Sequence, residues 1–143
     1  MSLSRFRDRA QIHPCGWSVA DSSMSFRKLP MASLDMDGRT MLLRIYEATG
    51  FLARARGLLG TAPLAGDEAL WIRPCNSVHT LGMRYAIDVV FLDRRQRVIA
   101  MRQSLQPLRL AAVRRAHSTV ELKAGTAAVL GISIGSQFDR RVS

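Results

Sequence analysis

Four ionisable side chains in the second half of the chain could carry out acid–base chemistry together. His79, Arg84 and Asp88 fall within ten residues of one another, and Glu121 follows further along the chain. Two carboxyl groups with a histidine beside them, either His79 or His117, form the set that general acid–base catalysis uses. A small hydrolase or transferase with Asp88 or Glu121 as its acid–base residue is therefore one hypothesis for this sequence.

A structural role explains the same carboxylates more simply. Asp88 enters a strongly apolar segment, where a carboxylate must be paired or hydrogen-bonded to be tolerated. Arg56 or Arg84 could hold it in a fixed ion pair that positions the backbone. Residues four apart in one extended strand lie about 13 Å from each other, so any partner of Glu121 must come from a different strand. The sequence favours the structural interpretation of Asp88 over the catalytic one.

Other catalytic and metal-binding arrangements find little support. Cys75, His79 and His117 have side chains that ligate metals, but no two of them form a close ligand pair. On a single strand, Cys75 and His79 are too far apart to share one ion. Cys75 also lacks a recognised local signature of a cysteine nucleophile. We therefore predict neither a metal site nor a cofactor.

The segment His79–Asp93 shows most clearly which elements would position these groups. Its second half, IDVVFLD, is a run of β-branched and aromatic residues, which predicts a strand covered on both faces. The short connection 93–97 joins this strand to a second one over VIAMRQSL, as in a β-hairpin. Before it, SVHTLGM predicts a strand that bends at Gly82.

The remaining pattern is that of a compact, mainly β domain. Two short helices are predicted, over FLARARGLLG and AGTAAVLG, because each has helix-compatible residues and ends at a glycine. The total is about seven or eight short strands. Besides the three strands above, the predicted ones cover residues 40–48, 69–73, 108–113, 117–123 and 132–139, the last of them broken by Gly135.

The chain divides into a tail and one domain. Residues 1–38 are rich in Ser, Met, Asp and Arg without a sustained period, so we predict a poorly ordered N-terminal tail before a single domain over residues 39–143. Neither the apolar core of a signal peptide nor a run of the roughly 18 apolar residues of a membrane helix is visible. Cys15 and Cys75 are predicted to be free thiols. Together these features predict a cytoplasmic protein.

The charge is strongly positive. The sequence holds 21 basic residues against 11 acidic ones, for a net charge of +10. Such an excess is compatible with binding to nucleic acid or to an anionic surface. Much of it lies in pairs at predicted turns and at the chain end, Arg94–Arg95, Arg114–Arg115 and Arg140–Arg141, without aromatic residues that could stack on bases. The pattern argues against specific nucleic-acid binding and leaves non-specific binding to anionic surfaces open.

Three blocks of sequence occur in an order typical of one protein family. RGL at 56–58 comes first, VHTLGMRYAIDVVFLD at 78–93 and a strand-turn-strand follow, and VELKAGTAAVLGISIGSQF at 120–138 comes last. Over about residues 40–139 the chain resembles the bacterial and archaeal family called domain of unknown function 192. The resemblance implies a compact β-sandwich with jelly-roll-like character, and it implies no particular activity.

The resemblance also singles out positions. Carried over by position, the family's characteristic residues fall on Arg56, Met83, Asp88 and Glu121. Near His79 the family commonly has an aromatic residue, which makes His79 the variable member of the cluster. Many relatives begin with a secretion or lipoprotein signal, and no such signal is visible in this sequence.

These features lead to a preferred hypothesis of a small binding or accessory protein. Its polar pocket would be formed by Arg56, His79, Arg84, Asp88 and Glu121 on one side of the sandwich. Arginine in such a pocket suits a small ligand that carries a carboxylate or phosphate, or an acidic protein partner. The acid–base enzyme and the non-specific binder of nucleic acids or anionic surfaces remain as alternatives.

Overall fold

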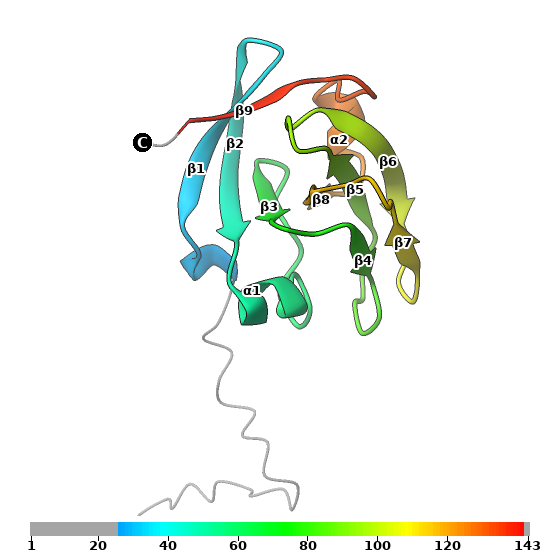
Figure 1. The fold of residues 1–143 in the computed structure, drawn as a ribbon. Helices are drawn as coiled ribbons and strands as arrows, with labels where there is room; N and C mark the ends of the chain where they lie inside the picture. The colour runs from blue at the N-terminus through cyan, green and yellow to red at the C-terminus, as the bar shows by residue number, and fades with distance from the viewer. Residues whose placement is uncertain (1–25, 142–143) are drawn as a thin grey trace, which may run out of the picture.

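The computed structural model describes residues 26–141, which form a curled seven-stranded sheet, a two-stranded sheet and three short helical segments (Figure 1). The helical segments are the 3₁₀-helix η1 (Phe26–Lys28), α1 (Phe51–Arg56) and α2 (Thr126–Val129). The strands are β1 (Met31–Met36), β2 (Arg39–Ala48), β3 (Glu68–Ile72), β4 (Ser77–His79), β5 (Ile87–Leu92), β6 (Val98–Leu105), β7 (Leu110–Ala112), β8 (Ser118–Lys123) and β9 (Phe138–Arg141). The prediction of a mainly β fold is confirmed.

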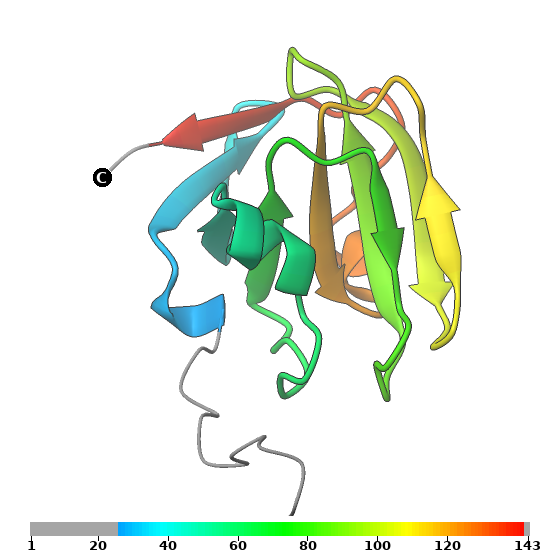
Figure 2. The same ribbon diagram turned by 60° about the horizontal axis from the view of Figure 1, so that its bottom comes forward.

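The order of strands in the large sheet is β6-β5-β8-β3-β2-β1-β9, and β4 pairs with β7 in the small sheet. All neighbouring strands are antiparallel except β2 and β3. A parallel pair needs a crossover connection, because its two strands start at the same end of the sheet. Helix α1 lies in that crossover, which places it beside the sheet rather than at its edge (Figure 2).

Both faces of the large sheet are buried. On one face Trp71 and Leu122 belong to a cluster that includes Phe138, whose ring meets that of Trp71 edge-on at 6.4 Å. On the other face a second cluster is covered by the small sheet, which contributes Val78 and Ala111. All six residues of β5 are buried. This confirms the prediction that IDVVFL is a strand covered on both sides.

The folded part begins earlier than the sequence indicates. Residues 31–36, assigned above to a poorly ordered tail, form β1, which pairs with both β2 and β9. Before it, Phe26 is buried and its ring packs edge-on against Tyr46 at 5.2 Å. The sequence of β1 shows no clear alternation because Leu34, Asp35 and Met36 are all buried, and its pairing with β9, from the other end of the chain, leaves no local pattern. Residues 1–25, with Cys15, lie outside the described residues.

Three strands are markedly shorter than predicted, one of them β7, which covers Leu110–Ala112 instead of 108–113. Within 77–83 only Ser77–His79 is extended, because Thr80 donates its hydroxyl to the carbonyl oxygens of Gln106 and Arg109 and the chain turns at Gly82. The prediction of a strand over 132–139 is wrong up to residue 137. Gly131 and Gly135 have φ of +69° and +94°, which break an extended conformation. No helix within residues 26–141 is long and apolar enough to cross a membrane.

Candidate functional site

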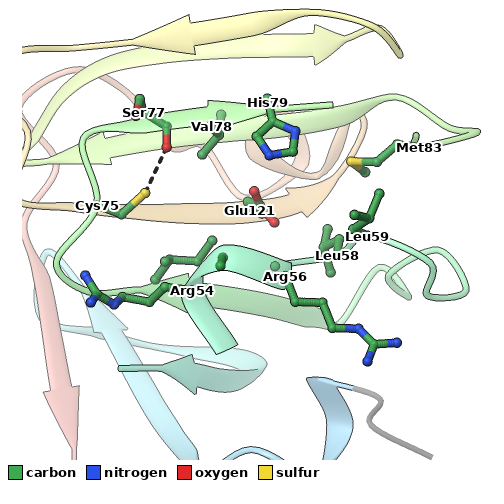
Figure 3. A pocket seen from close by; sticks show the side chains of 13 residues that line it. Arg54, Arg56, Leu58, Leu59, Cys75, Ser77, Val78, His79, Met83 and Glu121 are labelled. Atoms are coloured by element: carbon green, nitrogen blue, oxygen red, sulfur yellow. Dashed lines mark hydrogen bonds between the residues drawn. The ribbon is translucent and has the colours of Figure 1, made fainter. Parts of the chain in front are cut away.

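A small pocket lies where α1 and the turn after it face β4 (Figure 3). Its volume is about 50 Å³, and Ile72 of β3 and Glu121 of β8 also line it. Helix α1 ends at Gly57, which has φ of 49° and ψ of −127°, a conformation that only glycine adopts readily. A Cβ atom added there would lie 3.8 Å from Oε2 of Glu121. The glycine therefore brings the backbone of this turn close to the carboxyl group.

Glu121 is the buried polar group of this pocket. Strand β8 lies between β3 and β5, so Glu121 is flanked by Leu70 and Val89 and is only 4% exposed. Its Oε2 has no hydrogen-bond partner among the described residues. Burial raises the pKa of the Glu121 carboxyl to about 7. At neutral pH this group is therefore present in both its protonated and its ionised form, and it can donate or accept a hydrogen bond.

The walls around Glu121 are apolar on one side and polar on the other. Leu58 and Met83 are buried and contribute hydrocarbon and thioether surface. On the polar side the Sγ of Cys75 donates to the carbonyl oxygen of Ser77 at 3.1 Å. His79 is exposed, and in Figure 3 its imidazole lies between β4 and Glu121. His79 and Glu121, two of the residues of the predicted site, both line this pocket.

Of the two predicted arginines, Arg56 lies at the rim of the Glu121 pocket and Arg84 lies outside it, whereas Arg54 is a further arginine at the rim. Arg56 lines the pocket, but its guanidinium group points away from Glu121 into solvent (Figure 3). Arg54 is half-buried, donates from Nη1 to the carbonyl oxygen of Pro74 at 3.1 Å, and has a buried Nε without a partner in the described structure. Arg84 lines a neighbouring hollow of about 520 Å³, which shares Leu58 and Met83 with the Glu121 pocket.

Asp88 does not join this group. In the pairing of β5 with β8, Asp88 lies opposite Leu122 and Val89 lies opposite Glu121, so the two carboxylates are on opposite faces of the sheet. Oδ1 of Asp88 accepts a hydrogen bond from the backbone N–H of Ser104 at 2.8 Å, and Oδ2 accepts one from Ala127 at 3.0 Å. Its partners are therefore two backbone amides, not the arginine side chains that the sequence suggests.

Comparison with known proteins places this architecture in a family. The model of the family named domain of unknown function 192 (DUF192) and described as "Uncharacterized ACR" matches residues 32–139. The chain belongs to this family. No functionally curated protein matches the sequence.

Two solved structures share the fold of this DUF192 protein. A proposed transcription regulator from Sinorhizobium meliloti 1021 superposes with a TM-score of 0.71 at 19% identity, over 78% of this chain and 95% of that one. A protein of unknown function from Novosphingobium aromaticivorans DSM 12444 superposes with a TM-score of 0.70 at 17% identity, over 90% of this chain and 91% of that one. At such identities the similarity concerns the fold alone.

The fold of the DUF192 chain gathers most of the positions that the family resemblance singled out. Arg56, Met83 and Glu121 line the same pocket, and Asp88 lies outside it. Within residues 26–141 no three His, Cys, Asp or Glu side chains lie close enough to hold a metal ion. The polar side chains that line the pocket include the carboxyl group of Glu121, the thiol of Cys75 and the imidazole of His79.

One serine of the DUF192 chain lies in a pattern associated with nucleophiles. Gly131-Ile132-Ser133-Ile134-Gly135 has the spacing GxSxG, which in α/β-hydrolases marks a turn from a strand into a helix. Here the segment follows α2 and precedes β9, and the hydroxyl group of Ser133 lies 3.4 Å from that of Ser136. The structural context of a nucleophile elbow is therefore missing.

Two pocket residues were not predicted from the sequence. Arg54 and Cys75 line the pocket, but neither is among the site residues predicted above, where Cys75 found little support as a metal ligand or a nucleophile. Their positions depend on the loop at Pro74, whose carbonyl oxygen accepts a hydrogen bond from Arg54. The backbone N–H of Cys75 donates to the carbonyl oxygen of His117 at 2.9 Å. Contacts between segments this far apart leave no local signal in the sequence.

Proposed function

We propose that this DUF192 protein binds a small carboxylate-bearing ligand whose anionic group enters the Glu121 pocket. The observation that carries the proposal is the buried Glu121 side chain, which lines the pocket and whose Oε2 is buried without a partner among the described residues. A buried polar atom without a hydrogen bond costs about 1–3 kcal/mol. Such atoms are rare in native proteins, and each calls for an explanation such as a bound ligand or water.

The protonation state of Glu121 determines which ligand group fits. When protonated, the carboxyl donates a hydrogen bond to a carboxylate oxygen of the ligand, and such charge-assisted bonds are short and strong. When ionised, it repels an anion at close range in an apolar setting. Because burial raises the pKa of Glu121 to about 7, the acceptor form gives way to the donor form just below neutral pH. A volume of about 50 Å³ suits a group of a few heavy atoms, such as a carboxylate.

The positive charges of Arg54, Arg56 and Arg84 around the pocket favour an anionic ligand over a neutral one, while the guanidinium groups of Arg54 and Arg56 themselves point away from Glu121 (Figure 3). Arg54 has a buried donor, Nε, without a partner among the described residues, and Arg56 is exposed at the rim. The part of the ligand that stays outside the pocket would extend toward the neighbouring hollow, where Arg84 is exposed. Guanidinium groups prefer carboxylate partners because both are planar and can form two parallel hydrogen bonds.

Calorimetric titration with acetate, succinate and benzoate at about pH 6 and about pH 8 tests the proposal. We expect at least one carboxylate to bind, with an affinity that falls about tenfold between these pH values as Glu121 loses its proton. In Glu121→Gln the amide still donates, so binding should persist and lose this pH dependence. In Glu121→Leu binding should disappear.

A control separates Glu121 from the second titratable side chain at the rim. His79→Ala should keep the pH dependence of binding, because the proton that matters is on Glu121. If Glu121→Leu binds the carboxylates as tightly as the wild type, or if none of them binds at either pH, the proposal is wrong.

A second candidate function is catalysis with Glu121 as a general acid. It is favoured by one observation, the pKa of about 7, since an efficient catalytic acid has a pKa near the working pH. Asp88 cannot be its partner across the sheet, so Glu121 would act alone or with His79 or Cys75. Glu121→Gln distinguishes the two functions, because it should retain ligand binding and abolish turnover of chromogenic esters and glycosides.

A further inference from the structure

A second cluster of charged side chains lies apart from the Glu121 pocket. Arg94, Arg95, Arg114, Arg115 and His117 line an open groove of about 460 Å³, and all five are exposed. The first two belong to the turn between β5 and β6, and the other three to the loop between β7 and β8. We refer to this feature as the arginine groove.

Backbone hydrogen bonds hold the two sides of the arginine groove together. The N–H of His117 donates to the carbonyl oxygen of Leu92 at 2.7 Å, which ties the β7–β8 loop to the end of β5. Within the turn, the N–H of Gln96 donates to the carbonyl oxygen of Asp93 at 3.0 Å. Figure 2 shows the two segments next to each other at the upper edge of the view. These hydrogen bonds thus fix the backbone positions from which the four arginine side chains extend.

The charges of the arginine groove are not neutralised. Elsewhere in residues 26–141 arginines form ion pairs with carboxylates, namely Arg27, Arg44, Arg73, Arg140 and Arg141. The four groove arginines form neither ion pairs nor side-chain hydrogen bonds with any described residue. The one acidic lining residue, Asp93, accepts from the backbone N–H groups of Arg95 and Arg97 at 2.8 and 3.0 Å. Four like charges in one groove favour a multiply charged anion.

We propose that the arginine groove binds a short chain of linked phosphate groups. Phosphate oxygens match the fork of donors on a guanidinium group, and successive phosphates supply several negative charges within the length of the groove. A lone carboxylate or phosphate would leave most of the positive charge uncompensated.

The surroundings favour a compact polyphosphate over an extended nucleic acid. The adjoining hollow is lined by Pro74, Cys75, Asn76, Ala116 and His117, so no Arg or Lys continues the groove on that side. No Phe, Tyr or Trp lines the arginine groove, and binding of single-stranded nucleic acid usually relies on such side chains to stack on the bases.

Titration calorimetry with sodium tripolyphosphate at about 50 mM salt tests this site, because the electrostatic contribution is large at low salt. The double variants Arg94→Ala/Arg95→Ala and Arg114→Ala/Arg115→Ala should each weaken binding by about tenfold or more, since each removes charge-assisted hydrogen bonds. Orthophosphate should bind more weakly than tripolyphosphate. Both variants should melt within about 2 °C of the wild type, because exposed side chains without contacts add little to stability.

A matched control tests whether net charge alone is responsible. Arg102→Ala/Lys123→Ala removes the same charge from exposed positions on β6 and at the far end of β8, and it should bind tripolyphosphate within about twofold of the wild type. The proposal is overturned if the wild type does not bind tripolyphosphate or if the control loses as much affinity as the groove variants. It is also overturned if a thymidine oligonucleotide binds more tightly than tripolyphosphate.

Discussion

Asp88 and Glu121 are two buried carboxyl groups on adjacent strands, on opposite faces of the sheet, and they differ in their hydrogen bonds. Both are buried, with 1% and 4% of their surface exposed. Asp88 accepts from two backbone amides, one on β6 and one on α2. Glu121 has an oxygen without a partner in the described structure, and its pKa is raised to about 7 by burial alone. Burial and residue type therefore do not distinguish a structural carboxylate from a functional one.

The difference in partners gives the two groups different roles. A carboxylate that accepts hydrogen bonds from the backbone amides of two different segments fixes these segments relative to each other. Asp88 does this for α2 and for the part of β6 near Ser104, a residue with φ of +50°. A carboxyl group with an oxygen that lacks a hydrogen bond does not join segments in this way. The protein folds in spite of the free energy that burying this oxygen costs. We interpret Asp88 as part of the scaffold and Glu121 as part of the site.

The substitution Asp88→Asn is the strongest test of the structural role that this comparison gives to Asp88. The amide NH₂ group would face a backbone N–H, so at least one buried hydrogen bond is lost and a donor is left unpaired. We expect the free energy of unfolding in urea to fall by about 3–5 kcal/mol. Asp67→Asn is the control: Asp67 pairs with Arg44 at the exposed surface, and its loss should leave stability unchanged. If the two variants had equal free energies of unfolding, Asp88 would not have the structural role that we assign to it.

The sequence could predict the elements on which these carboxylates lie but not the faces they occupy. The periods of IDVVFL and VIAMRQSL identify β5, β6 and their hairpin, because both strands and the turn are local in sequence. Whether Asp88 and Glu121 share a face depends on the register of β5 with β8, in which Val89 lies opposite Glu121. A shift of one residue would place both carboxylates on one face. No local pattern encodes that register.

The burial of Glu121 was also beyond the sequence. In STVELK the alternation assigns Val120 and Leu122 to the core and Glu121 to the other face, which a one-sided sheet would expose. The structure covers that face with α1 and the β4–β7 pair, so five successive residues of β8 are buried. The covering segments come from three separate parts of the chain, and the positions of Arg56 and Arg84 relative to Glu121 depend on them in the same way.

The pH dependence of the free energy of unfolding tests the other half of the comparison, the raised pKa of Glu121. Because the folded-state pKa is raised from 4.5 to about 7, the folded protein binds a proton more tightly than the unfolded chain. The stability linked to this proton is fully present below pH 4.5 and is lost as the pH rises through 7. Relative to Glu121→Gln, the wild type should lose up to about 3 kcal/mol across this window, at about 1.4 kcal/mol per tenfold change in proton affinity.

Urea unfolding of wild type and Glu121→Gln at a series of pH values measures this effect. The variant should be the more stable protein above neutral pH, because its neutral side chain avoids a buried charge. The difference should level off above about pH 8. A constant difference between the two proteins at all pH values would mean that the folded and unfolded states bind this proton equally well, so that the pKa of Glu121 is not raised in the folded protein.

A smaller effect of opposite sign should come from Glu68, a buried glutamate that does have partners. Arg27 donates to both of its oxygens, at 2.9 and 2.6 Å, and the N–H of Ala65 donates at 2.9 Å. The hydrogen bonds from Arg27 lower the pKa of the Glu68 carboxyl below 4.5. Its stabilising contribution is therefore present above that pH and is lost as the pH falls through the folded-state pKa.

Glu68→Gln should accordingly reduce the free energy of unfolding at neutral pH by about 1–2 kcal/mol, through the loss of charge-assisted hydrogen bonds. The difference from the wild type should shrink on acidification, whereas that of Glu121→Gln changes between pH 4.5 and about 7 and has the opposite sign. If both variants showed the same pH dependence, the presence or absence of hydrogen-bond partners would not explain the difference in pKa between Glu68 and Glu121. Opposite slopes would extend the distinction between Asp88 and Glu121 to a pair of residues with identical side chains.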